Sequence, residues 1–492
     1  MLLDSSSWGH VSAPRRLFLV FTSIRNSFAG RLLLASIGLG LLAGCSSSRN
    51  EAQYAAVEQH RAQQQQEAQA QAAASPTATP AQQPTAATQP SPGTPTSSPE
   101  VAAAHVVRNY WTNFRGPNRD GKYDEMPVLT SWPSKGLQLL WKEPVGVGYS
   151  SLTIADGRAY TIEQRRSKEV VAAYDVDTGR ELWTQAWSAE YTDETGDGPR
   201  TTPTWDEGWL YALGATGELR CLNAKTGAIR WGKNILSDNG AENLSWAMAA
   251  SPLIVDDKVI VVPGGTGGKS VVAYNKATGA PAWKVQNDRA AYVSPMLVTL
   301  AGRRQVLIVS ANRVFGLAPE DGALLWSQTW DTDNGINVSQ PIIVDKNRFF
   351  ISSGYGKGAA LIEVTSAGNA FQSRSVWTNV NMKNKFNSSV LHDGYVYGLD
   401  EGILTCLDVN TGARKWKGGR YGYGQVLLAS GHLIVMSDAG ELALVKASPT
   451  EYSEVARFTA LDGKTWNYPA IAGGKLFVRN AKEMAAYKIG AE

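Results

Sequence analysis

The sequence predicts an all-β protein built from eight similar repeats that close into a ring. Three observations support this prediction: a large anchor residue, in most repeats the tryptophan that ends a turn motif, recurs at intervals of 39 to 52 residues, a short apolar strand opens each repeat, and the composition favours turns and large packing residues. The 492 residues include 48 glycines and 16 tryptophans, and 43% are hydrophobic, which is enough for a large core.

The turn motif combines a tight turn with a large anchor four residues after its glycine. Its first clear copy contains Asp175, Thr178, Gly179 and Trp183. An Asp or Asn side chain folds onto nearby backbone amides, and glycine accepts the positive φ that the turn requires. Each copy therefore predicts a β-hairpin. Related copies occupy residues 223–231, 275–283, 320–326 and 408–416.

The spacing of the anchors defines the size of one unit. Trp141 and Trp377 continue the series, and Phe458 takes the eighth position. A period of this length equals one four-stranded blade of a β-propeller, and eight apolar strand openings run in phase with it. We therefore predict an eight-bladed β-propeller of antiparallel blades over residues 137–490. The tryptophan anchors are Trp141, Trp183, Trp231, Trp283, Trp326, Trp377 and Trp416.

The last blade lacks an outer strand after its own opening. Residues 475–478 and 484–489 supply two more strands, and no fourth follows them. Residues 137–145, which contain Trp141, have the pattern of the missing strand. We expect this N-terminal strand to close the ring, which leaves no exposed sheet edge.

The N-terminus resembles a bacterial lipoprotein signal. Residues 32–44 form an apolar run before Cys45, and this run is too short to span a membrane as a helix but suits a signal-peptide core. The small residues before Cys45 resemble a lipobox, which implies that residues 1–44 are removed and Cys45 carries a diacylglycerol. Ser46 favours the outer membrane, by analogy with known sorting rules. The alternative for this apolar run is a short buried helix. Arg15 and Arg16 resemble a twin-arginine export motif, so the choice between twin-arginine and Sec export stays open.

A low-complexity segment follows the cysteine. Ala, Gln, Pro, Ser and Thr fill 41 of the 50 positions from 51 to 100. Such a segment cannot bury enough apolar surface to offset its ordering entropy, so we predict a disordered tether over residues 45–104. Within it, residues 51–74 favour a transient helix and residues 75–100 an extended chain. Residues 105–136 form a pre-propeller segment.

Charge and histidine content exclude some functions. The net charge of +3 includes four arginines and one acid in residues 1–44, so the remainder has equal numbers of basic and acidic side chains. A neutral chain without a basic block lacks the footprint of nucleic-acid binding. Only two of the five histidines lie beyond residue 105, which argues against a histidine-rich metal centre or a His-based triad. We expect no metal site and assign no catalytic residue.

Function is expected in the loops that lead from the outer strand of one blade to the inner strand of the next. These loops meet at one end of the central channel and hold aromatic and cationic side chains, which suit a flat or anionic ligand or a peptide. The alternative is that these side chains pack on one another and plug the channel. The predicted binding residues are Arg200, Trp246, Tyr292, Asn337, Lys383, Lys385, Tyr421 and Trp466.

The Asp-x-x-Thr-Gly-x-x-x-Trp unit resembles the repeat of PQQ-type (pyrroloquinoline-quinone-type) β-propellers. This superfamily includes quinoprotein alcohol dehydrogenases and BamB-like lipoproteins of outer-membrane-protein assembly. The resemblance covers residues 137–490, and residues 111–121 resemble the openings of uncharacterised bacterial members. Together with the lipoprotein signal, it implies a binding scaffold without a cofactor, anchored in the cell envelope and facing the periplasm. Its partners would be envelope proteins, such as the outer-membrane assembly machinery or its clients.

A quinoprotein dehydrogenase is the alternative implied by the same resemblance. Such enzymes typically carry an adjacent cysteine pair, a Ca²⁺ ion held by Glu and Asn, and an Asp base. The cysteines here are Cys45, Cys221 and Cys406, so an adjacent pair is absent, and the loop carboxylates match no calcium motif. PQQ with calcium is therefore expected only under this alternative. Cys221 and Cys406 fall in the second and sixth blades, too far apart for a disulfide, so we expect buried thiols.

Overall fold

The computed structural model describes residues 50–74, 111–368 and 370–491 of the chain. The predicted signal peptide 1–44, the lipidation site Cys45 and the predicted extended chain 75–100 lie outside these ranges. Within these ranges, no helix combines the length and apolar character needed to cross a membrane.

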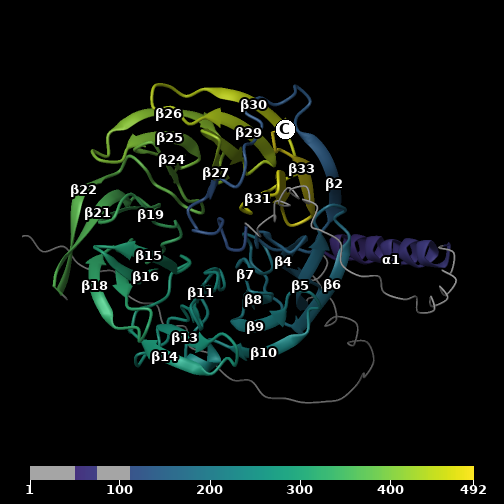
Figure 1. Ribbon diagram of the computed structural model, residues 1–492, viewed down its shortest axis with the longest axis horizontal. Helices are drawn as coiled ribbons and strands as arrows, with labels where there is room; N and C mark the ends of the chain where they lie inside the picture. Colours follow the sequence, from purple (N-terminus) through teal and green to yellow (C-terminus); the bar gives the residue numbers. More distant parts are fainter. Residues whose placement is uncertain (1–49, 75–110, 369, 492) are drawn as a thin grey trace, which may run out of the picture. The chain divides into compact units, whose positions relative to one another are not determined.

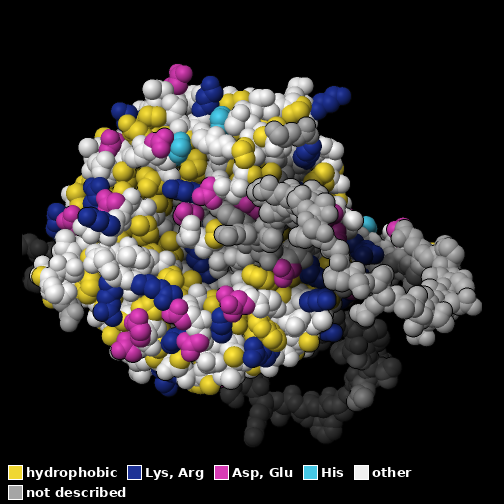
Figure 2. Space-filling view, in the orientation of Figure 1, with side chains coloured by type: hydrophobic (Ala, Val, Ile, Leu, Met, Phe, Trp, Pro, Cys, Tyr) yellow, Lys and Arg dark blue, Asp and Glu magenta, His cyan; other side chains and the backbone are white. Residues whose placement is uncertain are grey.

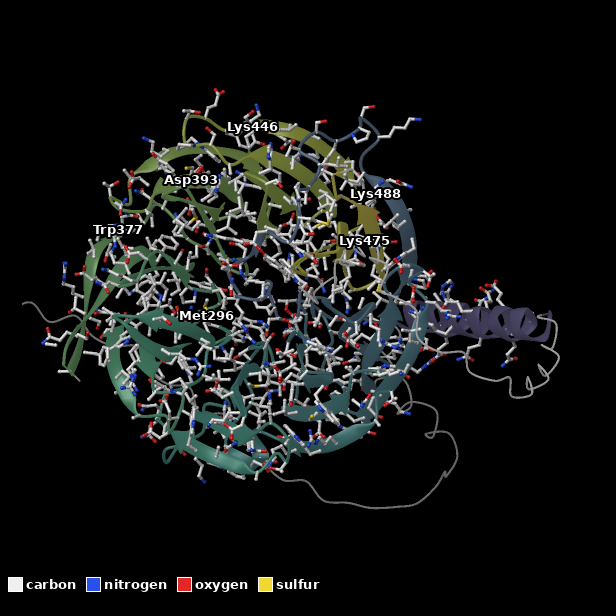
Figure 3. All side chains as sticks on the ribbon, viewed as in Figure 1. Met296, Trp377, Asp393, Lys446, Lys475 and Lys488 are labelled. Carbon is white, nitrogen blue, oxygen red and sulfur yellow. The ribbon has the colours of Figure 1, made fainter. Side chains whose placement is uncertain are left out.

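Eight antiparallel sheets surround a central channel, so the predicted eight-bladed β-propeller is confirmed (Figure 1). In blades 1 to 7, four consecutive strands run from the channel to the periphery. Figure 3 shows the result for two labelled residues: Met296, on the innermost strand of blade 4, lies nearer the centre than Trp377, on the outermost strand of blade 5.

The strands of blades 1 to 4 are β3 (Thr153–Ala155), β4 (Arg158–Arg165), β5 (Lys168–Asp175), β6 (Glu181–Ser188); β7 (Thr204–Asp206), β8 (Trp209–Leu213), β9 (Glu218–Asn223), β10 (Ile229–Asn234); β11 (Leu253–Val255), β12 (Lys258–Val261), β13 (Val271–Asn275), β14 (Pro281–Val285); β15 (Met296–Leu300), β16 (Arg303–Val309), β17 (Arg313–Leu317) and β18 (Leu324–Thr329). Those of blades 5 to 7 are β19 (Ile342–Ile343), β20 (Arg348–Ser353), β21 (Gly358–Ala367), β22 (Ala370–Asn379); β23 (Val390–His392), β24 (Tyr395–Asp400), β25 (Ile403–Asp408), β26 (Arg414–Arg420); β27 (Gln425–Ala429), β28 (His432–Met436), β29 (Glu441–Lys446) and β30 (Glu454–Thr459). A 3-10 turn, η1 (Ser237–Asn239), precedes blade 3.

Blade 8 joins the two ends of the propeller. It contains β31 (Ala470–Ala472), β32 (Lys475–Arg479), β33 (Glu483–Lys488) and, as its outer strand, β2 (Gln138–Pro144). β2 pairs antiparallel with β33, and Trp141 lies opposite Ala486. The predicted closing strand is therefore confirmed, and Figure 1 shows it beside β33.

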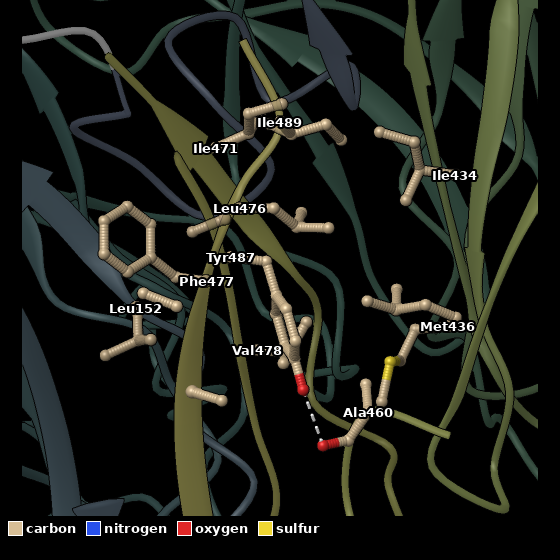
Figure 4. Packing of buried hydrophobic residues seen from close by; sticks show 14 of the residues in the cluster. Leu152, Ile434, Met436, Ala460, Ile471, Leu476, Phe477, Val478, Tyr487 and Ile489 are labelled. Atoms are coloured by element: carbon tan, nitrogen blue, oxygen red, sulfur yellow. Dashed lines mark hydrogen bonds between the residues drawn. The ribbon is translucent and has the colours of Figure 1, made fainter. Parts of the chain in front are cut away.

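One continuous apolar cluster seals this closure. Side chains of blade 8 pack against those of blades 7 and 1, as Figure 4 shows for Leu476, Tyr487, Met436 and Leu152. The Tyr487 hydroxyl donates a hydrogen bond of 2.9 Å to the carbonyl of Ala460, so the polar end of this buried ring is satisfied. The two chain ends are thus held by packing as well as by strand pairing.

The anchor tryptophans connect each blade to the next. Trp183 donates from Nε1 to the Ala224 carbonyl at 3.1 Å, and its ring covers Gly227 in the turn of blade 2. Gly227 has a φ of +75°, and a Cβ there would lie 2.6 Å from the Trp183 ring. The glycine is therefore required both by the turn and by its neighbour. The same relation joins Trp141 to Gly179, Trp231 to Gly279, Trp283 to Gly322 and Trp377 to Gly412.

The other anchors occupy the same outer strands but have different partners. Trp326 donates at 2.5 Å to Gln305 Oε1 of its own blade, and its ring lies 5.7 Å from that of Phe349. Trp416 donates to the Ser448 carbonyl at 2.8 Å. Phe458 packs against Tyr487 with ring centroids 5.4 Å apart. The Asp-Thr-Gly turn is missing in the blades that follow Trp326 and Trp416, which explains the change of partner.

Residues 51–74 differ from the disordered tether predicted for this part of the chain. They form a 24-residue helix, α1 (Glu51–Ala74), in which Tyr54, Val57 and Arg61 are buried against the propeller. The composition indicated helix, but it gave no sign of this contact because only one face of the first turns takes part in it.

The two propeller cysteines are buried and unpaired, as predicted. Cys221 lies on β9 of blade 2 and Cys406 on β25 of blade 6. Burial raises the pKa of Cys221 to about 11 and that of Cys406 to about 12. Both therefore pack as small apolar groups and not as reactive thiolates.

Candidate functional site

A pocket of about 200 Å³ opens at the end of the channel where the inter-blade loops meet. All eight of the loops or strand starts that enter an inner strand contribute to it, so this end of the ring is called the loop face. Its walls are mainly aromatic and aliphatic. The lining residues are Phe114, Tyr149, Thr195, Arg200, Trp246, Ala249, Tyr292, Ile336, Val338, Tyr355, Phe386, Ser388, Gln425, Trp466 and Tyr468.

One wall of the pocket is a stack of aromatic rings from three loops. Tyr149 and Trp466 are nearly parallel, with centroids 5.4 Å apart and an interplanar angle of 26°. Phe386 approaches Trp466 at 5.1 Å and also meets Tyr423 edge-on. The Lys464 ammonium lies 3.6 Å from the centre of the Trp466 ring, so the stack also carries a positive charge at its margin.

A second aromatic pair stands in the loops that enter blades 3 and 4. The rings of Trp246 and Tyr292 are 5.8 Å apart and tilted by 50°. The Trp246 amide donates to the Tyr292 hydroxyl at 3.4 Å, which links the two loops. Large rings held by contacts with other loops present a preformed apolar surface to a ligand.

Arg200 is the charged residue of the pocket lining. Its two terminal nitrogens donate to the carbonyls of Gly198 and Gly196 at 2.6 and 2.9 Å. The guanidinium lies over Tyr191 at 4.7 Å and over Tyr149 at 5.4 Å. Burial lowers the pKa of Arg200, although nearby tyrosine and aspartate side chains oppose this effect. Arg200 therefore shapes its own loop while it faces the pocket.

The eight predicted binding residues fall into two groups. Arg200, Trp246, Tyr292 and Trp466 line the pocket. Lys385 lies at its margin, where its ammonium donates to the Tyr423 hydroxyl at 3.2 Å and lies 5.6 Å from the lining ring of Tyr355.

The other three predicted residues have partners outside the pocket. Asn337 is buried and donates at 2.9 Å to the Ser310 carbonyl. Lys383 pairs with Asp400 and Glu401 at 3.5 and 3.3 Å. Tyr421 is buried and donates at 2.5 Å to Glu454; burial raises the pKa of Tyr421, and the bonds to Glu454 and Tyr452 add to the effect. These three side chains stabilise the loops and blades.

Five lining aromatics are not among the predicted binding residues. Two of them, Tyr149 and Tyr468, lie in the inter-blade loops to which the prediction applied. Phe386 directly follows Lys385 in the loop that enters blade 6, so the same positional rule applied to it. Tyr355 follows β20, in a turn within one blade, and the rule did not include such turns. Phe114 precedes the propeller altogether, and no repeat pattern points to it.

The floor of the pocket comes from the pre-propeller segment 111–123, which crosses the channel. The carbonyl of Trp111 accepts from the Ile154 amide of blade 1, and that of Thr112 accepts from the Trp205 amide of blade 2, both at 2.9 Å. On the other side, the segment ends in β1 (Lys122–Tyr123), which pairs parallel with β27 of blade 7. Phe114 packs edge-on against Tyr468 at 5.8 Å. The segment connects blades on opposite sides and closes the pocket below.

Two buried arginines fix this floor to further blades. Arg119 donates to the carbonyls of Ser251 and Pro295 at 3.1 and 3.0 Å, and Arg115 donates to that of Ser389 at 2.8 Å. Neither arginine forms an ion pair with a carboxylate of the described ranges. Burial lowers the pKa of Arg119 to about 9. The positive charge is therefore held by carbonyl dipoles, which is typical of a structural clamp.

The donor set of the pocket does not match a quinone with calcium. Among the described lining residues there is no Asp, Glu, His or Cys, and the described chain holds no group of three such residues placed to bind a metal. The terminal nitrogens of Arg200 are already engaged by carbonyls. Cys221 and Cys406 lie in different blades and cannot form the adjacent pair. The side chains that line this pocket therefore do not fit such a cofactor.

The charge on the surface is mixed. Figure 2 shows Lys and Arg interspersed with Asp and Glu over the described part of the face it views. This distribution agrees with the neutral composition and differs from the basic stripe of a nucleic-acid-binding protein.

Three solved structures resemble the chain. BamB from Moraxella catarrhalis is 16% identical with a TM-score of 0.52, and the match covers 72% of this chain and 99% of that one. A quinohemoprotein alcohol dehydrogenase from Comamonas testosteroni is 14% identical with a TM-score of 0.55, covering 78% and 81%. The computationally designed protein Ika8 is 9% identical with a TM-score of 0.50, covering 72% and 100%. Because these proteins differ in kind, the likeness shows the fold alone.

A family model gives a more specific result. No curated protein matches the sequence. Residues 167–418 match the family model described as outer membrane protein assembly factor BamB, which is more than half of the chain. The eight blades, the tryptophan–glycine contacts between them and this match agree, and the chain belongs to the PQQ-repeat β-propeller family that this model describes.

Proposed function

We propose that this protein is an envelope lipoprotein whose loop-face pocket binds a segment of a partner protein. The observation that carries the proposal is the convergence of all eight blades on one aromatic pocket. Arg200, Trp246, Tyr292 and Trp466 take no part in the repeated turns or in the tryptophan–glycine contacts between blades, so the repeat does not account for them.

The size and chemistry of the pocket favour a peptide side chain over a larger ligand. A volume of about 200 Å³ is below the several hundred Å³ usual for drug-sized ligands. It suits one large aromatic or aliphatic side chain, with the rest of the segment lying across the loops. Buried aromatic anchors of this kind carry most of the energy of protein–protein contacts.

Family membership supports a partner in the envelope. The matching family model describes an assembly factor of outer-membrane proteins, and a solved BamB shares the fold. We therefore propose the outer-membrane assembly machinery or its clients as partners. The lipobox-like sequence before Cys45 supports an anchor in the outer membrane, facing the periplasm. A Cys45→Ser protein should leave the membrane fraction or stay uncleaved; processing and sedimentation like wild type would contradict the anchor.

The pocket is tested by crosslinking from its wall in intact cells. A photo-crosslinking amino acid at Tyr292 should capture an outer-membrane protein or an assembly component, and Trp246→Ala in the same chain should abolish the product. Trp209→Ala is the matched control, because Trp209 is also half-buried but begins β8 at the opposite end of blade 2. Equal loss of the product in both variants, or no product at all, would reject the pocket as the binding site.

The dehydrogenase alternative has its own outcome. Purified protein that absorbs as a bound quinone and oxidises alcohols or sugars with an artificial acceptor would overturn the scaffold proposal. A protein that does neither, yet crosslinks from Tyr292, would support it.

A further inference from the structure

The first turns of α1 carry a continuous contact with blades 8 and 1. Tyr54, Val57 and Arg61, spaced three and four residues apart, lie on one face of the helix and are only 5, 0 and 6% exposed. Tyr54 and Val57 are the only apolar residues of α1 larger than alanine. Beyond these turns, side chains such as Gln66 and Glu67 are exposed. The apolar part of this contact is therefore made by the two residues of α1 that have a large apolar side chain.

Polar contacts fix the same turns in register. Gln53 donates from Nε2 to the carbonyls of Val145 and Lys482 at 2.8 and 2.6 Å. Arg61 donates to the Pro144 carbonyl at 2.9 Å and pairs with Glu181 at 3.2 Å. Figure 1 shows α1 next to β2 and β6, the strands that carry Pro144 and Glu181.

The N-terminal end of α1 lies at the loop face. Asn50 donates at 2.5 Å to Asp197, which belongs to the same loop as the pocket residues Thr195 and Arg200. Arg166, in the turn between β4 and β5, pairs with Glu51 at 2.6 Å. These contacts fix the point from which the preceding chain departs.

We infer that α1 is a clamp that brings the lipid-bearing N-terminus out at the loop face, so that the pocket opens beside the membrane surface. The inference rests on the proposed lipidation of Cys45. Asn50 is five positions after Cys45, and five residues of chain reach at most about 18 Å. Without the clamp, the nearest fixed point would be Trp111, and 66 residues reach more than about 200 Å.

With this clamp, the low-complexity segment after α1 no longer acts as the spacer between the propeller and the membrane. Residues 75–110 then come after the clamp in the chain, so their length no longer sets the distance to the membrane. The pocket is presented to partner segments that lie close to the bilayer. Partners deep in the periplasm are disfavoured.

The orientation is measured on vesicles that carry the full-length lipidated protein. Donor dyes are attached to Glu194→Cys, in a loop of the loop face, or to Asp156→Cys, in a turn at the opposite end of blade 1; both positions are exposed and the native propeller thiols are buried. Energy transfer to an acceptor in the membrane should be markedly stronger from position 194. Equal transfer from both positions, or stronger transfer from position 156, would overturn the inference.

Two variants test whether α1 is responsible. Val57→Asp places a charge in the buried contact and should abolish the difference between the two dyes. Ala56→Asp adds the same charge on the exposed side of the same turn and should preserve it. Deletion of residues 76–103 should also preserve the difference in energy transfer between the two dye positions. A Val57→Asp protein that keeps the difference, with an unchanged melting temperature of the propeller, would reject the clamp.

A last measurement separates the clamp from the anchor. In full-length Cys45→Ser protein, the amides of residues 52–64 should remain protected from hydrogen exchange, and Val57→Asp should remove that protection. If wild-type protein fails to bind vesicles while this protection is present, the lipidation proposal fails and the helix contact stands. Absence of protection would reject the clamp itself.

Discussion

The two ends of the ring are built from different kinds of sequence. At one end, the Asp-x-x-Thr-Gly turns repeat, and their polar side chains form hydrogen bonds within the turn itself. Asp175, for example, accepts from the amides of Asp177 and Thr178 at 3.0 and 2.9 Å. At the loop face, the loops differ in length and composition, and aromatic rings gather without a repeated pattern. Repetition thus marks the scaffold, whereas large side chains that the repeat does not require mark the site.

The largest expected effect comes from removing an anchor of the repeat. Trp183→Ala should lower the free energy of unfolding by about 3–4 kcal/mol, because it empties the space over Gly227 and removes one of the two donors to the Ala224 carbonyl, the other being the Tyr160 hydroxyl. Urea denaturation gives this value. Trp246→Ala, at the loop face, is the comparison and should cost less than about 1 kcal/mol. Equal losses of unfolding free energy in the two variants would contradict the proposed difference between scaffold and site.

The floor of the pocket should be the next most sensitive place. Arg119→Met removes a guanidinium that ties the segment 111–123 to Ser251 and Pro295, so we expect a loss of about 3 kcal/mol. Thermal unfolding followed by tryptophan fluorescence measures it. Arg119→Lys keeps the charge but cannot reach several carbonyls at once, and it should recover only part of the loss. Full recovery by lysine would mean that charge matters here and geometry does not.

The pH dependence of stability should show whether Glu169, a buried ionisable group near the loop face, has a structural role. Its carboxylate accepts from Trp187 Nε1 and the Ala215 amide at 2.9 and 2.6 Å. Burial raises the pKa of Glu169 from 4.5 to about 7, although both hydrogen bonds oppose this effect. Because the folded pKa is above the unfolded one, its stabilisation is complete below about pH 4.5 and is lost as the pH rises through about 7.

The resulting pH dependence is measured by denaturation at pH 4.5 and 7.5. Wild-type protein should lose about 2 kcal/mol more between these two values than Glu169→Gln, which cannot ionise. The opposite sign, or identical slopes, would show that Glu169 stays ionised in the folded protein.

The smallest effect on stability is expected inside the pocket. Trp466→Ala removes one ring of the stack with Tyr149 and Phe386, and we expect the free energy of unfolding to change by less than about 1 kcal/mol. Capture of the partner should nevertheless weaken about tenfold or more. Binding and melting are measured on the same preparation. A variant that unfolds, or one that binds normally, would assign this stack to packing.

Much of the fold was predictable because the repeat encodes it directly. The glycine of each turn and the tryptophan four residues later specify a hairpin and its contact with the next blade. Counting these units gave eight blades and showed that the last one needed 137–145. The contact of α1 was not predictable, since Tyr54, Val57 and Arg61 are too few to stand out in an Ala- and Gln-rich segment.

The site was predictable only in part. Loop position alone selected Arg200, Trp246, Tyr292 and Trp466, which line the pocket, and it also selected Asn337 and Tyr421, which do not. The difference lies in partners from distant strands, such as the Ser310 carbonyl and Glu454, that no local pattern reveals. Phe114 was missed because it reaches the pocket from outside the repeats.

The segment 111–123 has a consequence for how the protein forms. It precedes every blade in the chain, yet it ends up at their common axis, so the blades assemble around a core that was synthesised first. The closing pair of β2 and β33 joins nearly the first and the last strands to be made. During synthesis from the N-terminus onward, the blades would be added one after another to an open arc, and the axis segment would be enclosed only when β33 pairs with β2. Assembly of the ring is thus directional, and this pairing completes it.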